Sequence, residues 1–463
     1  MKNILKTFAI MTLVGNCLYS QVVEVDEVVK LAINNNLQIK IVEDDIKINN
    51  DKKGQTLALY KPKLKLSGGY IHLNEMPDIV EVARKLGQLN NGLDLAFDKL
   101  AQVYSTSPYS LLYSGLANGL SQVELQDDGL NYSSVKLSFE QPLYTGGKIT
   151  AVNKQVDISI DISELEKKKS ISDITFETKK AYYNVVLAKR TLNTVNEIYK
   201  DVEKHLSEAN SYYKAGIVSE LDVMRAKAKL SEVKQKIVQA ENAVDISKAY
   251  LNFVIGKDLP KDFEPNETII PTNLNESYED IENKALENRI ELKIYEKKSE
   301  LAKENKKVIS SQKKPVVAIQ GEYKYEGTDL TEEDPQWQIG IVGSWNIYTG
   351  GSTSSQLDEA SSTIGKVQNG IELAKSSIKI DVKKAYLDMV NSVESIKVAE
   401  QTLTQATEAN RMASVSYSTG YGSSMEKMDA EAFLEQAKNT YDNAINQYIV
   451  AKYNLEKATG MYY

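Results

Sequence analysis

Four short segments of the chain alternate apolar and polar residues with the period of a β-strand. They span residues 63–71, 132–140, 316–326 and 336–347. Alternation over such a length indicates a strand with one apolar and one polar face. Each segment has about ten residues, the length of a strand that crosses a bilayer, and an apolar outside with a polar inside is typical of an outer-membrane barrel. A water-soluble four-stranded sheet with one wet face would show the same alternation.

Apolar residues elsewhere recur at steps of three and four, which predicts amphipathic helices. The steps are clearest from Ala181 to Ala209 and in the stretch from Ala385 to Ala413, where they form the seam of a coiled coil. We expect two long helices, each about 100 Å in length, and further helices of roughly half that length. The long helices span residues 148–213 and 352–417, and the shorter ones span 27–59, 222–255, 278–311 and 426–459.

The chain contains an internal duplication. The sequence Tyr-Thr-Gly-Gly at 144–147 recurs 204 positions later at 348–351. Nearer the N-terminus the offset is 253, so that Pro62 matches Pro315. The difference of 49 residues is an insertion into the first half, in a loop at 72–130. A first repeat, a linker and a second repeat therefore follow the N-terminal segment, at residues 21–260, 261–277 and 278–463.

Each repeat reads helix, strand, loop, strand, long helix, turn and helix, so the predicted fold class is mainly α with a small β part. Rods of this length need lateral neighbours, and the strands of one chain are too few to close a barrel with an aqueous lumen. Rotational symmetry supplies both, because three chains would give twelve strands and a ring of helices. The sequence therefore predicts a homotrimer.

Composition excludes several kinds of chemistry. The formal net charge is −8, whereas a nucleic-acid partner would call for clustered Lys and Arg. The chain has two histidines, His72 and His205, and one cysteine, Cys17. A disulfide, a cysteine-based zinc site and a thiol redox centre are therefore excluded. We expect no enzyme activity, no cofactor and no metal site, and we expect both histidines to be ordinary surface or packing residues.

Residues 1–20 have the pattern of a secretory signal peptide. Two lysines precede an apolar run, and the segment ends at the small residue Ser20, after which we expect cleavage. The alternative is lipidation of Cys17, which the preceding Asn16 disfavours. No later stretch offers the roughly 18 uninterrupted apolar residues of a membrane helix, so a membrane span would have to consist of strands in a closed barrel.

Glycines mark two kinds of turn. The pairs Gly146, Gly147 and Gly350, Gly351 lie where a strand changes into a helix within a few residues. We expect them to adopt backbone angles that other residues avoid, with the preceding threonines capping the helices. Gly216 and Gly420 interrupt helical patterns that soon resume, and each is expected to end a long helix in a left-handed C-cap.

The layout resembles that of the TolC-like outer-membrane efflux factors. The resemblance rests on the segment 141–147 with its echo at 345–351, and on the helix-turn-helix at 213–223 with its echo at 417–428. It implies a trimer in which a twelve-stranded outer-membrane barrel continues into a long periplasmic α-helical barrel. The implied function is a passive exit duct of an efflux or type I secretion system. Its implied partners are outer-membrane lipid, a periplasmic adaptor and an inner-membrane pump of the RND or ABC type.

The resemblance also implies a gate near the two hairpin turns. The turns at Gly216 and Gly420 would dock the adaptor, and Glu426 and Asp429 match the carboxylates that ring the narrow end of the family's channels. A ring of this kind would bind cations and discourage anions. Without the resemblance, the two carboxylates would be interpreted as part of a solvated helix face.

Two further gate residues are implied in the same way. Tyr417 and Asp222 match a tyrosine and an aspartate whose hydrogen bond holds the family's closed state. The family's arginine two residues after the second glycine is replaced here by Gly422, so one expected contact is missing. Arg225 lies nearby in the first repeat, and we do not assign it the missing role.

A second class of function stays open at this point, namely a periplasmic structural or adaptor coiled-coil protein without a pore. Such a protein would not need four amphipathic strands framed by a duplication. An enzyme ranks third, because no paired-carboxylate or nucleophile motif stands out. The sequence carries no signal of the exported cargo, since in such systems the pump selects it. The loop at 72–130 is expected to extend from the outer mouth of the barrel or to fold over it, as a plain loop extension, a partial plug or a phage or partner site.

Overall fold

The computed structural model describes residues 22–73, 130–260, 263–266, 274, 276–327 and 335–462. The predicted signal peptide and nearly all of the predicted loop at 72–130 lie outside the described residues. The chain divides into two units. The larger comprises residues 1–49, 158–300 and 365–463, and the smaller comprises 50–157 and 301–364.

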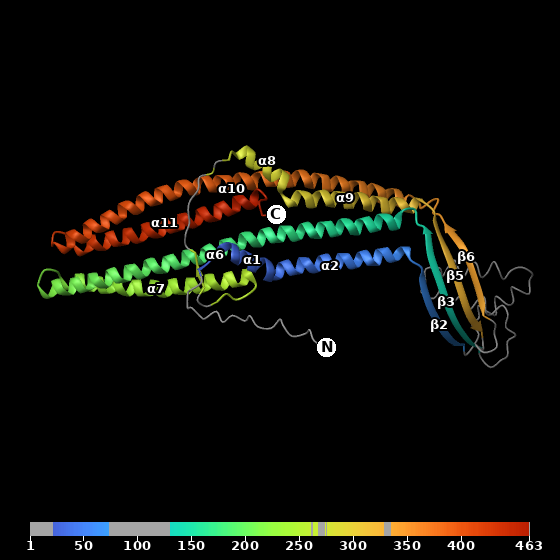
Figure 1. Cartoon of the computed structure of the whole chain (residues 1–463), viewed down its shortest axis with the longest axis horizontal. Helices are drawn as coiled ribbons and strands as arrows, with labels where there is room; N and C mark the ends of the chain where they lie inside the picture. Colours follow the sequence, from blue (N-terminus) through green and yellow to red (C-terminus); the bar gives the residue numbers. More distant parts are fainter. Residues whose placement is uncertain are drawn as a thin grey trace, which may run out of the picture. The chain divides into compact units, whose positions relative to one another are not determined.

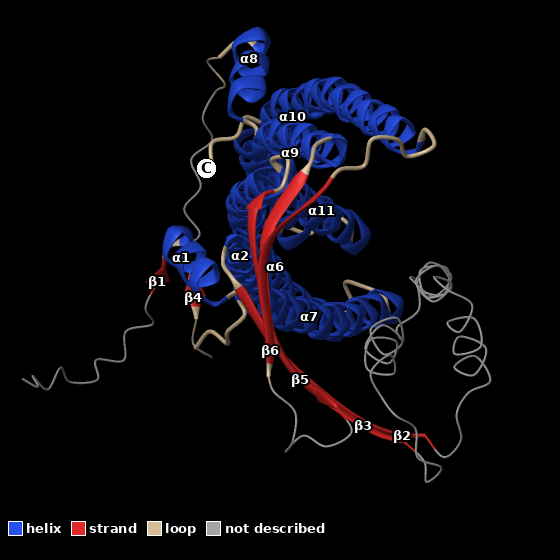
Figure 2. Cartoon of the chain, turned by 90° about the vertical axis from the view of Figure 1, so that its right-hand side faces the viewer, coloured by secondary structure: helices blue, strands red, loops and turns tan. Residues whose placement is uncertain are grey.

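The smaller unit contains a four-stranded antiparallel sheet (Figure 2). Its strands follow one another in the order β2 (Lys63–Leu73), β3 (Leu130–Tyr144), β5 (Val316–Gly327) and β6 (Gln336–Ser344). All the predicted strands are present. β3 is longer at both ends than the predicted range of 132–140, and β6 ends before the predicted limit of 347.

The strand register gives this sheet one apolar face. A row of paired apolar residues that crosses all the strands consists of Leu66, Leu137, Tyr323 and Trp337. These side chains are exposed. Adjacent positions point to the opposite face, where Lys136 forms an ion pair with Glu322. The alternation read from the sequence therefore corresponds to a sheet with a polar face and an exposed apolar face.

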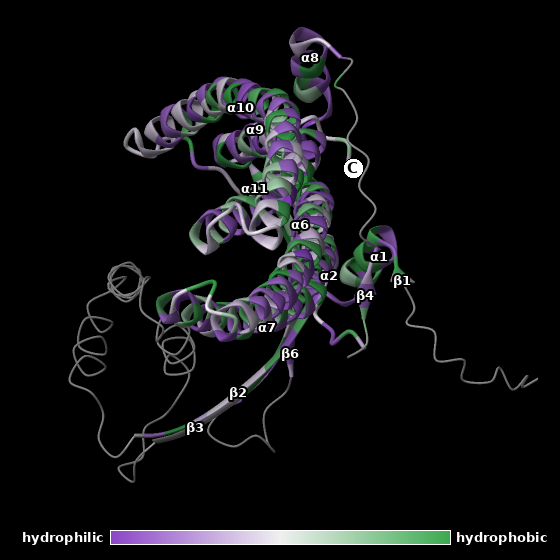
Figure 3. Ribbon diagram, turned by 90° about the vertical axis from the view of Figure 1, so that its left-hand side faces the viewer, coloured by the Kyte–Doolittle hydropathy of each residue, from purple (hydrophilic) through white to green (hydrophobic). Residues whose placement is uncertain are grey.

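Two helical hairpins dominate the larger unit (Figure 1). Helix α6 (Lys148–Lys214) is followed by α7 (Glu220–Ile255), and α10 (Ser352–Ser418) is followed by α11 (Ser424–Ala458). These bounds agree with the predicted ranges to within two residues. Hydrophilic and hydrophobic residues alternate around α6, α7 and α10 (Figure 3), as expected for helices that pack along one face. None of the described helices combines the length and the apolarity needed to cross a membrane.

The structure corrects the two single helices predicted at 27–59 and 278–311. The first is divided into α1 (Val25–Asn35) and α2 (Leu37–Leu57), and the second into α8 (Tyr278–Asn288) and α9 (Ile290–Ser310). The chain is extended at Asn36, with ψ of 129°, and at Arg289, with ψ of 121°. Neither position is a proline or a glycine, so the strongest sequence signals for a break are absent.

The side chain at each break is anchored to the end of a hairpin. Asn36 Nδ2 donates a hydrogen bond to the carbonyl oxygen of Val254 at 2.7 Å. Arg289 Nη1 donates to the carbonyl oxygen of Ala458 at 3.4 Å. The two donors correspond through the offset of 253 and the two acceptors through the offset of 204. The duplication therefore extends from the sequence to individual contacts.

Each repeat also has its own apolar core. The first core contains Val28, Ala181, Val185 and Leu251. The second contains the duplicated positions Ile281, Ala385, Met389 and Leu455. The matching composition shows that the repeats pack in the same way around their long helices.

A two-stranded pairing near the N-terminus was not predicted. β1 (Val22–Val23) pairs in parallel with β4 (Glu264–Pro265), which lies within the predicted linker 261–277. The Tyr182 hydroxyl donates to the carbonyl oxygen of Val23 at 2.7 Å and accepts from the backbone N–H of Asn266 at 2.6 Å. Burial raises the pKa of Tyr182 to about 12. This tyrosine therefore links α6 to β1 and to the residue that follows β4.

Candidate functional site at the hairpin turns

The two hairpins turn in the same way. Gly216 has φ of 74° and Gly420 has φ of 80°. After Gly216, the N–H of Ile217 donates to the carbonyl oxygen of Tyr212 at 2.9 Å. In the second hairpin, the N–H of Tyr421 donates to the carbonyl oxygen of Ser416 at 3.0 Å. This six-residue closure is the Schellman motif. The predicted left-handed C-caps are confirmed.

A capping box starts the helix after each turn. Ser219 Oγ accepts from the N–H of Asp222, whose carboxylate accepts from the N–H of Ser219 at 3.1 Å. In the second repeat, the carboxylate of Glu426 accepts from the N–H of Ser423 at 2.9 Å, and Ser423 Oγ accepts from the N–H of Glu426 at 3.1 Å. Asp222 and Glu426, both predicted as gate residues, thus also stabilise the starts of α7 and α11. The spacing Ser-x-x-Asp/Glu was the sequence signal for this role.

The exposed carboxylates and the buried tyrosine of the predicted gate lie in different surroundings. Glu426 and Asp429 are exposed near the start of α11. Tyr417 is buried near the end of α10, and its hydroxyl has no hydrogen-bond partner in the described part of the chain. Burial raises the pKa of Tyr417, and the negative charges of Glu208 and Asp222 raise it further.

The predicted hydrogen bond between Tyr417 and Asp222 is not formed in this structure. The Asp222 carboxylate is engaged by the backbone N–H and the hydroxyl of Ser219. It also lies 4.0 Å from the Arg225 guanidinium. Both bonds from Ser219 go to Oδ2, so the Asp222 carboxylate is oriented by its own turn and not by Tyr417.

Gly422 occupies a place with no room for a side chain. A Cβ there would lie 2.7 Å from Ser416 Oγ and 3.0 Å from the backbone N of Tyr417. The N–H of Gly422 donates to the carbonyl oxygen of Ser416 at 3.0 Å. An arginine at position 422 would therefore clash with Ser416 and Tyr417 in this turn.

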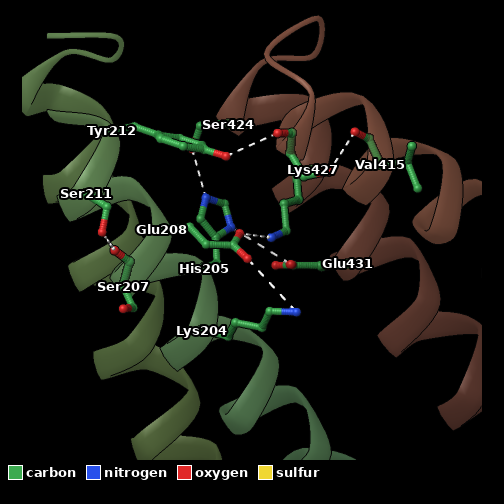
Figure 4. A network of polar contacts seen from close by, with 11 residues as sticks. Lys204, His205, Ser207, Glu208, Ser211, Tyr212, Val415, Ser424, Lys427 and Glu431 are labelled. Carbon is green, nitrogen blue, oxygen red and sulfur yellow. Dashed lines mark hydrogen bonds and ion pairs between the residues drawn. The ribbon is translucent and has the colours of Figure 1, made fainter. Parts of the chain in front are cut away.

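A largely buried polar cluster beside the turns was not predicted from the sequence (Figure 4). It joins α6 to α11 and consists of His205, Glu208, Ser424, Lys427 and Glu431. The Lys427 ammonium donates to Glu208 Oε2 at 2.9 Å, and His205 Nε2 lies 3.1 Å from Ser424 Oγ. His205 is 1% exposed and Lys427 is 6% exposed. These contacts link residues 219 positions apart, so local patterns carry no direct signal of them.

The strand-to-helix turns also match their prediction. All four glycines have positive φ, between 61° and 89°. Thr145 Oγ1 accepts from the N–H of Ile149 at 3.4 Å, and Thr349 Oγ1 accepts from the N–H of Thr353 at the same distance. The two turns differ at their first glycine, because a Cβ on Gly146 would lie 2.8 Å from the carbonyl oxygen of Ser311. The left-handed glycines and the capping threonines therefore explain why the sequence Tyr-Thr-Gly-Gly occurs at both turns.

Comparison with known proteins agrees with this architecture. The outer membrane efflux protein family model matches residues 104–257 and 282–461. The outer membrane protein TolC of Vibrio cholerae is 24% identical over 377 residues, which cover 78% of this chain and 82% of the relative. TolC of Escherichia coli is 22% identical over 353 residues, covering 71% of this chain and 70% of the relative.

Solved structures share the fold. The outer membrane protein VceC of Vibrio cholerae aligns with a TM-score of 0.70 and 16% identity, covering 94% of this chain and 96% of VceC. The CmeC outer membrane channel of Campylobacter jejuni aligns with a TM-score of 0.73 and 16% identity, covering 94% of this chain and 85% of CmeC. The predicted resemblance is therefore confirmed: the chain belongs to the outer membrane efflux protein family and is similar to the TolC proteins.

Proposed function

We propose that three copies of this chain assemble into one duct that crosses the outer membrane and extends into the periplasm. The observation that carries the proposal is the amphipathic sheet, whose edge strands are β2 and β6. Pairing β6 of one copy with β2 of the next would produce twelve strands and leave no free sheet edge. The exposed apolar row from Leu66 to Trp337 would then face lipid, and the charged face would line the pore.

The duct is passive in this proposal. Small molecules or proteins enter it from a periplasmic adaptor and an inner-membrane pump, and the pump selects the cargo. Exposed apolar residues at the hairpin turns support adaptor docking there: Ile217 and Leu221 in the first hairpin, and Tyr421 and Met425 in the second. Apolar and aromatic side chains gathered at an exposed turn are suited to a protein interface.

The narrow end of the duct lies at these turns in our proposal. Glu426 and Asp429 are exposed near the start of α11. Threefold symmetry would bring the carboxylates of three copies around one axis, where they would attract cations.

Membrane fractionation and planar-bilayer recording test the proposal together. We expect the full-length protein to stay with the outer membrane after a high-salt wash. The purified detergent-solubilised trimer should produce discrete conductance steps. A protein that the salt wash releases, and that gives no conductance, would instead be the pore-free periplasmic coiled-coil protein that the sequence left open.

The mature N-terminus offers a separate test of the proposed export route. Signal-peptide cleavage after Ser20 would make Gln21 the first residue. N-terminal sequencing of the membrane-extracted protein should therefore begin at Gln21. A blocked N-terminus with a lipid-modified Cys17 would establish the lipoprotein alternative.

A further inference from the structure

Lys427 is a charged residue at a buried position where the other repeat has an apolar residue. Its duplicated position in the first repeat is Val223, which is 4% exposed and helps fill the start of α7. Lys427 itself is 6% exposed. Because a valine satisfies the same fold in one repeat, folding of the hairpin does not require a lysine in the other. The buried ammonium therefore calls for a specific partner.

Its partner lies on the other hairpin. Lys427 Nζ on α11 donates to Glu208 Oε2 on α6 at 2.9 Å and lies 5.2 Å from the centre of the Tyr417 ring. The duplicated position of Glu208 is Met412, so both halves of this ion pair are absent from the other repeat. The Lys427 side chain is 8% exposed and that of Glu208 is 27% exposed, so separating the pair would leave the buried ammonium without a compensating charge.

A second cross-hairpin contact lies beside the first. His205 Nε2 is 3.1 Å from Ser424 Oγ, and the other ring nitrogen is 3.8 Å from Glu431 Oε1. The His205 ring also lies 5.1 Å from the Tyr417 ring. In the other repeat, the position of His205 is Ala409 and that of Ser424 is Glu220. Like the Lys427–Glu208 pair, this contact therefore has no counterpart at the duplicated positions.

Another ion pair between the same two hairpins is more exposed. Lys438 Nζ on α11 lies 2.7 Å from Glu197 Oε2 on α6, and the two side chains are 31% and 62% exposed. Exposed pairs of this kind contribute little, because water solvates the separated charges. This pair joins the same two helices as Lys427 and Glu208, lies eleven residues further from the turns, and is more exposed. It therefore provides a matched control.

We propose that the Lys427–Glu208 ion pair and the His205–Ser424 contact form a polar latch that holds the α10–α11 hairpin against the α6–α7 hairpin at the turns. The latch takes the role that the sequence predicted for Tyr417 and Asp222, and it rests on the proposed gate at these turns. Any widening that moves the start of α11 away from α6 must break both contacts. Lys427 and His205 are positioning residues in this device, since they set the resting width without contacting the cargo.

Planar-bilayer recording on full-length trimers tests the latch. We expect Lys427→Val to raise the mean single-channel conductance, or the fraction of time in the open state, at least threefold. The double variant Lys427→Val with Glu208→Met should be open to a similar extent. At each position this variant has the residue found at the duplicated position of the other repeat, namely the valine of Val223 at 427 and the methionine of Met412 at 208. It therefore leaves no unpaired charge. Lys427→Arg should behave like the unmodified protein, because arginine keeps the ion pair. The exposed control Lys438→Met should change neither quantity.

The outcomes separate the latch from the proposed duct. Trimers of Lys427→Val and of the double variant that conduct like the unmodified protein would overturn the latch while leaving the duct intact. Trimers that fail to conduct in every form, the unmodified protein and all latch variants alike, would overturn the duct itself. If Lys427→Val fails to assemble, the double variant decides, and resting conductance equal to that of the unmodified protein would then reject the proposal. The swap Lys427→Glu with Glu208→Lys should restore the low resting conductance, which a purely structural role of the lysine would not explain.

Discussion

Ser423 and Glu426 cap the start of α11 reciprocally, through hydrogen bonds of 2.9 and 3.1 Å between the backbone N–H of each residue and the side chain of the other. Glu426 thus has a structural role in addition to its proposed place in a ring of carboxylates. Replacing it by alanine would remove a cap and a charge together. The two effects can be separated by the choice of substitution.

Glu426→Gln should keep most of the cap and remove the charge. We expect this variant to bind blocking cations more weakly in bilayer recordings, with thermal stability within about 0.5 kcal/mol of the unmodified protein. Glu426→Ala should weaken block to a similar degree and also lose about 1 kcal/mol of stability, because one hydrogen bond of the capping box disappears. Asp429→Asn serves as a second charge probe outside the cap. Unchanged cation block in both Glu426→Gln and Asp429→Asn would remove these carboxylates from the gate.

Tyr417→Phe should have little effect, contrary to what a latch between Tyr417 and Asp222 implies. The hydroxyl is buried without a hydrogen-bond partner in the described part of the chain, so its removal leaves no acceptor unsatisfied. We expect unchanged conductance and a stability change within about 0.5 kcal/mol. The control is Tyr212→Phe, which removes a 3.2 Å hydrogen bond to the carbonyl oxygen of Ser418. A clear rise in conductance for Tyr417→Phe alone would restore the original latch.

Gly146→Ala and Gly350→Ala form a matched pair at the duplicated strand-to-helix turns. Both glycines have φ near +60°, which costs a non-glycine residue about 1 kcal/mol. At Gly350 no atom lies within 4 Å of an added Cβ, whereas at Gly146 the carbonyl oxygen of Ser311 lies at 2.8 Å and Lys314 Cβ at 2.9 Å. We expect Gly146→Ala to cost about 2 kcal/mol more than Gly350→Ala, measured by thermal melting of the trimer. Equal losses would mean that the backbone yields at Ser311.

Alkaline pH should destabilise the region around Tyr182. The pKa of its hydroxyl is raised from 10.0 to about 12 by burial, so the folded state favours the protonated form. The resulting stability is fully present below pH 10 and is lost as the pH rises through about 12. Tyr182→Phe should cost about 2 kcal/mol at pH 8, since two hydrogen bonds disappear.

The same variant should lose less stability than the unmodified protein between pH 10 and pH 12. Thermal melts across this range measure the difference. A matched control is Tyr213→Phe, since Tyr213 is exposed at the end of α6. The assignment to Tyr182 would fail if both variants showed the same alkaline slope as the unmodified protein.

The periodicity of the sequence predicted the strands and hairpins well, because a half-exposed sheet and a coiled-coil seam repeat their pattern over many residues. The breaks at Asn36 and Arg289 were missed because tertiary contacts to Val254 and Ala458 hold the extended residues.

The candidate site was less predictable than the fold. The turn glycines and carboxylates follow from short motifs, yet the Lys427–Glu208 pair depends on two helices meeting far apart in sequence. One indirect signal was present: at a seam position where the first repeat has Val223, the second has Lys427. A departure of this kind within a duplication marks a position where the two halves have acquired different tasks.

Asn36 and Arg289 differ in size and charge, yet each reaches the matching carbonyl oxygen of its own repeat. The bend therefore does not depend on one particular donor: a neutral amide holds it in the first repeat and a guanidinium holds it in the second. A substitution at either position should be tolerated as long as the new side chain still donates to that carbonyl oxygen.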